Sequence, residues 1–442
     1  MIAPSRRRFL TTCGSIVALA SLGGCGGDPS SDTSAETGWR TVGRESAATA
    51  GSNASAEQSD ADTVFSAPPT LAWERSFVSP DPQAVYSLAR TPRDGILVAG
   101  VAVRGDRVEG VVANVGEDGT HRWTRTYAPR PTTGILDVCS TADGGTALAG
   151  IVTDRGPAGR PRGWVGKTDA DGTLVWSREF AATGVSTVTE LAGGRGYVVG
   201  GVRGLGPDGL DRTGPVTAWL SRLETDGTLR WEQTFTTSRA VGISSVIQST
   251  TSSVLVTGAA TPGHRTVTVD VDVRAWIASL TLDGSIEWST SIRGEQADTF
   301  VRTVQPLRTD NLVAVGTTTP AFGGPSEAWA VKLTTDGEPL WRHTYPGQGT
   351  SVGGAVLAAP DGGVLIGGLT WPNIESTGRT WLTKVDPNGY QSWESSFGNS
   401  IGHMPRIEPR VTDLVRTRGG IALANGSRKR SVRRSWVYKL TP

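Results

Sequence analysis

One recurring phrase constrains the fold of this chain more than any other feature. Residues 218–235 read AWLSRLETDGTLRWEQTF, and close variants of this phrase occur five more times along the chain. Each variant has two apolar segments around a turn of the Asp-Gly or Asn-Gly type. Gly supplies the positive φ that a tight hairpin turn needs, so each phrase predicts two antiparallel β-strands joined by a short turn.

Two tryptophan positions mark the repeat. The second Trp of the phrase has equivalents at Trp73, Trp123, Trp176, Trp231, Trp288, Trp341 and Trp393. The first Trp has equivalents at Trp164, Trp219, Trp276, Trp329, Trp381 and Trp436, and Val111 takes the remaining slot. Packing between like units needs the same side chain in every unit, whereas a ligand site rarely needs seven copies. We therefore expect these tryptophans to be structural.

A second hairpin precedes each phrase. Residues 86–101, 135–151 and 355–369 each hold two apolar runs around an Asp-Gly turn. Each unit of about 53 residues therefore has four short strands, here called a to d. No segment shows sustained helical periodicity. This pattern predicts an all-β fold, a seven-bladed β-propeller of four-stranded antiparallel blades over residues 69–442.

The two ends of the repeat region are complementary. The first strand, LAWERSF at 71–77, is of type d, and the last strand, SWVYKL at 435–440, is of type c. We expect the N-terminal strand to pair with the last blade and close the ring, because closure removes edge strands that would otherwise template aggregation.

The repeat resembles a known prokaryotic family. AWAVKLTTDGEPLW (328–341) and TWLTKVDPNGYQSW (380–393) each follow an apolar hairpin with Asp-Gly-Gly at its turn. These segments are similar to the prokaryotic β-propeller repeat called SBBP, and more distantly to the Trp-docked blades of quinoprotein-like propellers. The resemblance implies a seven-bladed propeller lipoprotein.

The N-terminal sequence predicts the cellular location of the protein. SRRRFL resembles a twin-arginine export signature, with Arg6 and Arg7 as the pair, and Leu22-Gly23-Gly24-Cys25 resembles a lipobox. We expect residues 1–24 to be a signal peptide and Cys25 to be lipidated. Residues 25–68 are rich in Ser, Thr, Ala and Gly and are expected to form a flexible tether with a reach of about 35 Å. The protein would then be anchored to the outer face of the cell membrane.

Composition narrows the classes of function. The net charge of +1 gives no electrostatic case for nucleic acid. Cys139 is the only cysteine of the repeat region and is expected to be a small buried residue. The four histidines are scattered without zinc-ligand spacing. We expect no catalytic residues, no metal and no cofactor.

The long loops predict a ligand-binding face. The a–b and c–d turns are short, whereas length and variety collect in the b–c and d–a loops, which lie together at the other face of a propeller. Residues of this expected face include a basic run at 428–434. The candidates are Arg212, His264, Arg265, Trp371, His403, Arg406, Arg428, Arg430 and Arg433.

Two classes of function remain open in the sequence. The first is a binding scaffold on the cell surface for a protein or a polysaccharide, with the membrane contacted through the lipid anchor. The alternative is an extracytoplasmic propeller enzyme, a quinone-dependent oxidoreductase or a hydrolase, or a factor in envelope assembly. Fold alone does not choose between them.

Overall fold

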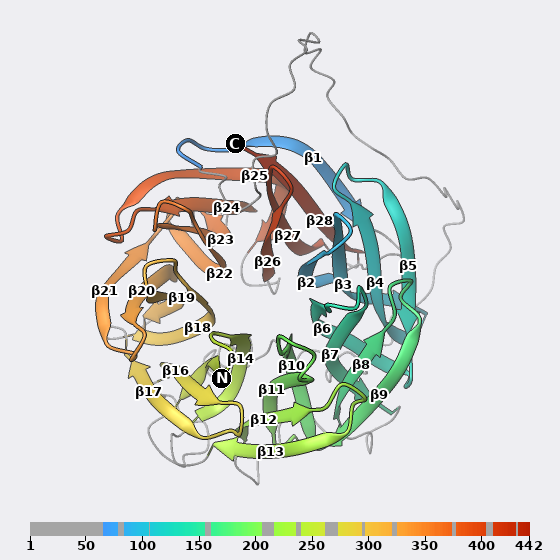
Figure 1. Cartoon of the computed structure of the whole chain (residues 1–442). Helices are drawn as coiled ribbons and strands as arrows, with labels where there is room; N and C mark the ends of the chain where they lie inside the picture. Colours follow the sequence, from blue (N-terminus) through green and yellow to red (C-terminus); the bar gives the residue numbers. More distant parts are fainter. Residues whose placement is uncertain are drawn as a thin grey trace, which may run out of the picture.

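The computed structural model describes most of the repeat region. The described residues are 65–77, 84–105, 107–154, 161–205, 216–235, 240–260, 273–293, 297–320, 325–373, 377–403, 410–429 and 432–442. Every regular element among them is a β-strand. The strands form seven four-stranded antiparallel blades around a central axis (Figure 1).

Each blade runs from an innermost strand a to an outermost strand d. Blade 1 is β2 (Ala84–Thr91), β3 (Gly95–Arg104), β4 (Arg107–Gly116) and β5 (His121–Tyr127), and blade 2 is β6 (Thr132–Ser140), β7 (Thr146–Thr153), β8 (Arg162–Thr168) and β9 (Leu174–Ala181). Blade 3 is β10 (Thr183–Glu190), β11 (Tyr197–Arg203), β12 (Thr217–Leu223) and β13 (Leu229–Phe235), and blade 4 is β14 (Ala240–Gln248), β15 (Ser253–Ala260), β16 (Arg274–Thr281) and β17 (Ile286–Ile292). Blade 5 is β18 (Ala297–Pro306), β19 (Asn311–Pro320), β20 (Glu327–Thr334) and β21 (Pro339–Tyr345), and blade 6 is β22 (Thr350–Ala358), β23 (Val364–Trp371), β24 (Thr377–Val385) and β25 (Gln391–His403). Blade 7 is β26 (Arg410–Thr417), β27 (Gly420–Lys429), β28 (Val432–Thr441) and β1 (Thr70–Phe77).

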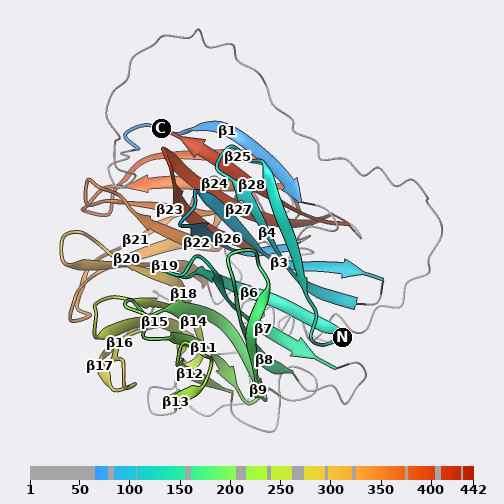
Figure 2. The same ribbon diagram turned by 45° about the vertical axis from the view of Figure 1, so that its right-hand side comes forward.

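The N-terminal strand closes the ring. β1 pairs with β28 in antiparallel register from Thr70 opposite Thr441 to Phe77 opposite Ser435. The two strands lie side by side in both views (Figure 1, Figure 2). A single parallel pairing of Val108 with Thr132 also joins blades 1 and 2. The seven-bladed fold and its closure by the first strand are confirmed.

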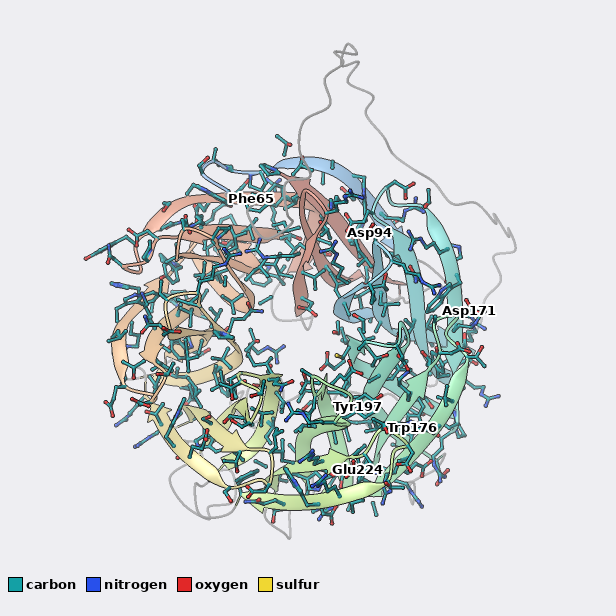
Figure 3. All side chains as sticks on the ribbon, viewed as in Figure 1. Phe65, Asp94, Asp171, Trp176, Tyr197 and Glu224 are labelled. Atoms are coloured by element: carbon teal, nitrogen blue, oxygen red, sulfur yellow. The ribbon has the colours of Figure 1, made fainter. Side chains whose placement is uncertain are left out.

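The residues before β1 replace a missing turn. In the other blades a hairpin connects strands c and d, but in blade 7 these strands come from opposite ends of the chain. Phe65 lies at the outer rim of the ring (Figure 3) and is 1% exposed, in a cluster that includes Leu365 and Tyr438. Its carbonyl accepts a hydrogen bond of 3.0 Å from the Trp393 indole of blade 6. The folded part of the chain therefore begins before residue 69.

The Trp of each d strand docks on the following blade. In four blades its indole N–H donates to a backbone carbonyl two residues before the Gly of the next c–d turn. The bonds are Trp73 to Glu117 at 2.9 Å, Trp176 to Thr225 at 3.0 Å, Trp231 to Leu282 at 2.9 Å and Trp341 to Pro387 at 3.1 Å. Trp176 also lies 5.7 Å from the Tyr197 ring of blade 3, measured between ring centroids (Figure 3).

The Trp of each c strand packs in the opposite direction, against the preceding blade. Trp164, Trp219, Trp276, Trp329 and Trp381 are at most 1% exposed. Trp219 of blade 3 lies edge-on to Phe180 of blade 2, with ring centroids 4.8 Å apart. Each such boundary between blades is therefore held by two indoles, one from each of the two blades. The buried rings supply much of the apolar area of the boundary.

The docked indoles predict the effect of changing a turn glycine. Gly337 has φ of 87°, and a Cβ atom placed there would lie 2.5 Å from the Trp288 ring. Gly193 has φ of 79°, but a Cβ atom there meets nothing within 4 Å. Both changes to Ala carry the strain of a positive φ, about 1 kcal/mol, and only Gly337→Ala also displaces an indole.

We therefore expect Gly337→Ala to lower the free energy of unfolding by about 1–3 kcal/mol more than Gly193→Ala does. Equilibrium denaturation in urea, followed by tryptophan fluorescence, measures the difference. Equal effects of the two substitutions would show that the indole does not rest on the turn.

Candidate binding site on the turn face

The innermost strands share one irregularity. Each has a β-bulge directly before one equivalent position, and the residues there are Ser87, Asp137, Thr187, Ser245, Thr303, Ala355 and Asp413. The following backbone N–H donates to the side chain of the preceding blade at several boundaries. Leu88 donates to Asp413 at 3.0 Å, Val188 to Asp137 at 2.9 Å and Val246 to Thr187 at 3.2 Å. These bonds tie the blades together around the axis.

Two buried carboxyl groups flank Ser87 in this ring of bonds. Ser87 Oγ lies 2.8 Å from Asp137 Oδ1 and 3.2 Å from Asp413 Oδ2. A hydroxyl carries one proton, so both contacts are hydrogen bonds only when one carboxyl group is protonated. Burial, together with the nearby charge of Asp137, raises the pKa of Asp413 to about 6. Burial also raises the pKa of Asp137.

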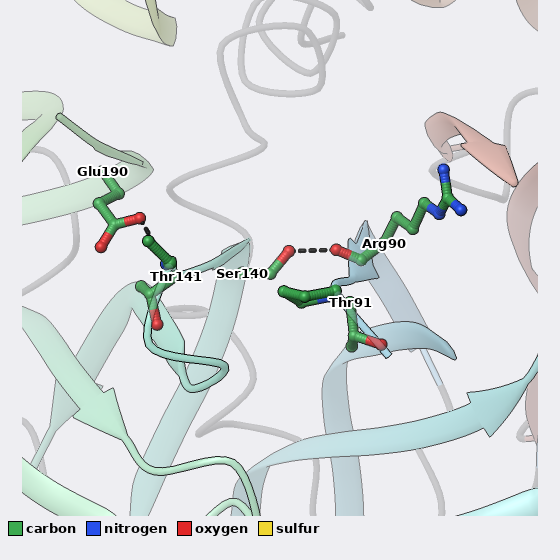
Figure 4. Close-up of a pocket in the computed structure, with 7 residues that line it drawn as sticks. Arg90, Thr91, Ser140, Thr141 and Glu190 are labelled. Carbon is green, nitrogen blue, oxygen red and sulfur yellow. Dashed lines mark hydrogen bonds between the residues drawn. The ribbon is translucent and has the colours of Figure 1, made fainter. Parts of the chain in front are cut away.

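A cavity opens at the end of the axis that carries the a–b turns, which we call the turn face. Its volume is about 420 Å³, and blades 1, 2 and 3 supply its walls (Figure 4). The lining residues are Arg90, Thr91, Pro92, Ser140, Thr141, Ala142 and Glu190. Arg90, Ser140 and Glu190 each lie three residues after the bulge position of their strand. Residues at the same repeat position in three successive blades therefore line the cavity.

The cavity has a mixed lining, and hydrogen bonds hold its polar groups in place. Glu190 accepts a hydrogen bond of 2.8 Å from the Ala142 backbone N–H, and burial raises the pKa of Glu190. Ser140 Oγ donates to the Arg90 carbonyl. The Arg90 guanidinium is directed away from Glu190 (Figure 4) and contacts Asp94 at 3.2 Å. Donors and acceptors thus stand on neighbouring strands that do not move independently.

A buried lysine holds the turn beside the cavity. Lys167 is 5% exposed and lies 2.9 Å from Asp143 in the a–b turn of its own blade. Asp143 also accepts from Thr141, a cavity residue. Burial raises the pKa of Asp143, but bonds from Thr141, Lys167 and Gly145 outweigh burial and lower it to about 2. Lys384 pairs with Asp361 at 2.7 Å in the same way.

Sequence reasoning missed this lysine position, although the sequence contains the signal. The residue three after the first Trp of the repeat is Lys167, Lys332, Lys384 or Lys439 in four blades, in a chain with only five lysines. Recurrence of a rare residue at one repeat position indicates a structural requirement. The cavity residues carry a weaker signal, because Arg90, Ser140 and Glu190 differ in type from blade to blade.

Most residues of the expected long-loop face lie outside the described residues. These are Arg212, His264, Arg265, Arg406 and Arg430. His403, Arg428 and Arg433 lie in strands β25, β27 and β28, but their side chains are not among those described. Arg6, Arg7 and Cys25 also lie outside the described range.

The structure corrects the expectation for Trp371. We expected it on a loop facing a ligand, but it ends β23 and is 1% exposed within the core that also holds Phe65. Its indole is covered because β23 extends to this residue and pairs it with Thr350. Cys139 is half-buried against the core of blades 2 and 3, and burial raises its pKa to about 12.

The described part of the chain lacks two features. No helix in this part of the chain is long and apolar enough to cross a membrane. Over the same described ranges, no three His, Cys, Asp or Glu side chains are grouped so that they could hold a metal ion.

Comparison with known proteins defines the class of the fold. No protein-family model matches the sequence, and no curated protein matches it. The structure is similar to a PL25 ulvan lyase bound to -[GlcA(1-4)Rha3S]-, with a TM-score of 0.50, 9% identity, and coverage of 83% of this chain and 96% of that chain. It is also similar to the WD40 domain of Neurospora crassa Pan2, with a TM-score of 0.49, 12% identity, and coverage of 86% and 97%. At these identities the likeness shows the fold alone, and the chain is a β-propeller protein.

The buried carboxyl group of Asp413 predicts how stability depends on pH. Its pKa of about 6 in the folded protein lies above the ordinary value of 3.8, so the folded state holds a proton that the unfolded state has lost. This contribution to stability is fully present below pH 3.8 and is lost as the pH rises through 6. The loss amounts to about 3 kcal/mol.

We expect Asp413→Asn to reduce the fall in unfolding free energy between pH 4 and pH 7 by about 2 kcal/mol. The exposed Asp310, changed to Asn, serves as the control for removal of one carboxyl group. Urea denaturation at a series of pH values measures both. If Asp413→Asn and the parent have parallel profiles, Asp413 does not hold a proton in the folded state.

Proposed function

We propose that this protein is an exported, lipid-anchored β-propeller that binds a polysaccharide at the axial cavity of its turn face. The observation that carries the proposal is the cavity itself, in which hydrogen-bonding groups from three blades meet at one end of the axis. Its volume of about 420 Å³ lies within the range of small-molecule sites.

The chemistry of the lining suits a polyhydroxylated ligand. A sugar hydroxyl both donates and accepts hydrogen bonds, so its site needs groups of both kinds. Glu190 supplies carboxylate oxygens as acceptors. The Thr91 hydroxyl accepts from the Gly95 N–H and has its own proton to donate, whereas the Thr141 hydroxyl gives its proton to Asp143 and can accept. Hydrogen bonds between neighbouring innermost strands hold these groups in place before a ligand arrives. This preorganisation reduces the conformational entropy lost on binding.

The N-terminal segment supports an extracytoplasmic location. Arg6 and Arg7 in SRRRFL, the apolar run after them and Cys25 together have the order of an exported lipoprotein signal. The chain between Cys25 and Phe65 is long enough to hold the propeller clear of the membrane while keeping it at the outer face. We also propose that the chain belongs with the SBBP-type propellers, on the basis of the repeats at 328–341 and 380–393.

A polysaccharide is preferred to a protein partner because the described site is a small cavity rather than a broad apolar surface. The ulvan lyase of similar fold is itself bound to a saccharide, so this fold can present a saccharide site. Binding of a protein or a polysaccharide at the long-loop face, with Arg212, His264, Arg265, His403 and Arg406 among its contacts, stays a prediction.

The proposal is tested by binding of defined oligosaccharides to the full chain with Cys25→Ser, measured by calorimetry after a screen on a glycan array. We expect saturable binding that becomes at least about tenfold weaker in Glu190→Gln, since a hydrogen bond to a charged group contributes 1.5–3 kcal/mol. Gln keeps an oxygen for the Ala142 N–H, so the turn should remain intact.

The matched control is Glu224→Gln, in the c–d turn of the same blade as Glu190 and outside the cavity. This variant should bind like the parent. Absence of saturable binding to every oligosaccharide, or equal binding by the two variants, would contradict the proposal.

A further inference from the structure

The carboxylate of Glu190 has no counter-ion in the described part of the chain. Glu190 lines the cavity and is half-buried. Its Oε2 atom accepts the hydrogen bond of 2.8 Å from the Ala142 backbone N–H. Among the described residues, no cationic side chain lies within ion-pair distance of Glu190, and its Oε1 atom accepts no hydrogen bond. One carboxylate oxygen at the wall of the cavity is therefore left for a ligand.

The other charges around the cavity are already paired. Arg90 is the second charged residue of the lining, but its guanidinium contacts Asp94 at 3.2 Å and is directed away from Glu190 (Figure 4). Asp143, in the turn beside the cavity, pairs with Lys167 at 2.9 Å. These two pairs cancel their own charges, so the lining presents one unbalanced negative charge.

A neighbouring blade shows that the fold does not need this charge. Gln248 holds the position of blade 4 that Glu190 holds in blade 3, and its Oε1 atom accepts a hydrogen bond of 2.7 Å from the Ala192 backbone N–H. Ala192 and Ala142 are equivalent residues of the a–b turns of blades 3 and 2, so the two contacts are the same. An uncharged amide oxygen is therefore sufficient to hold the turn, and the charge of Glu190 is available for another purpose.

A partly buried carboxylate is stabilised by a cation that donates hydrogen bonds to it. The ammonium group of an amino sugar is such a cation, and the rest of the sugar ring carries the hydroxyls that suit the remainder of the lining. We propose that Glu190 binds the protonated amino group of an amino sugar, so that the polysaccharide bound at the turn face is a cationic one. This inference rests on the proposed function and names the class of its ligand.

The experiment compares probes that share a backbone and differ in charge. The glucosamine tetramer carries free amino groups, and the N-acetylglucosamine tetramer carries neutral amides in their place. Tetralysine carries ammonium groups without a sugar. The protein is the full chain with Cys25→Ser, as parent and with Glu190→Gln, which copies the residue found in blade 4. The control is Glu224→Gln, which removes the same charge from the same blade outside the cavity.

We expect the parent to bind the glucosamine tetramer about tenfold more tightly than the N-acetylated tetramer at pH 6 and low salt, as a single charge-assisted contact allows. Glu190→Gln should remove this difference, and Glu224→Gln should leave it unchanged. The difference should shrink as salt rises, because the site is partly exposed. It should also be lost at pH 9, where an amine with the ordinary α-amino pKa of about 7.7–8.0 is neutral. Tetralysine should bind more weakly than the glucosamine tetramer.

Equal binding of the two sugar probes, or a difference that survives Glu190→Gln, would overturn the cationic class. Tetralysine that binds as tightly as the glucosamine tetramer would show that the site recognises a basic peptide instead of an amino sugar, which also overturns the inference. Thermal unfolding of each variant verifies that a loss of binding is not a loss of fold.

The outcome for the proposed function is separate. If a neutral oligosaccharide binds and Glu190→Gln weakens it, the proposed function stands even when the cationic class is wrong. If the parent binds no oligosaccharide of either kind, both the inference and the proposed function are wrong.

Discussion

The structure depends on one interaction repeated around the ring, the docking of an indole on the turn of the next blade. In four blades the Trp N–H donates to a carbonyl two residues before a Gly, and the ring lies so close to this Gly that a Cβ atom there would collide with it or be in tight contact. A hydrogen bond and apolar burial occur at the same contact, so each blade fixes the angle of its neighbour. The last contact in the series uses Phe65, which takes the place of a turn that the chain cannot make there. Closure therefore depends on a segment that precedes the first strand.

This rigidity explains why polar groups can be held at the axis. At several boundaries the bulge in the innermost strand turns a polar side chain toward the next blade, where a backbone N–H donates to it. Two carboxyl groups can then lie buried on either side of Ser87, because backbone donors satisfy them. The buried lysines act one step further out by fixing the a–b turns. The cavity is built on the ends of these same strands, so its geometry is set by the ring.

The fold could be predicted from the sequence because its signals recur in every blade. The residues of the site do not recur, so they could not be predicted in this way. The spacing of Trp176, Trp231 and their equivalents predicted the blades and their number, and the strand types at the two ends predicted the closure. The buried lysines were detectable by the same method. Phe65 was not, because it occurs once in a segment of linker-like composition. Arg90, Ser140 and Glu190 occupy one repeat position with different residue types, so only the placement of the strands around an axis brings them together. Trp371 was misassigned because the end of β23 has no turn signal of its own.

The closed ring is tested most directly by a disulfide between the two ends of the folded chain. Thr70 Oγ1 lies 3.0 Å from Thr441 Oγ1, so Cys at both positions should form a bond in the native protein under mild oxidation. The account predicts a disulfide within one molecule, formed without loss of structure, that raises the unfolding midpoint by cross-linking the unfolded chain. Thiols that stay reduced in the folded protein, or a disulfide that joins two molecules, would contradict it.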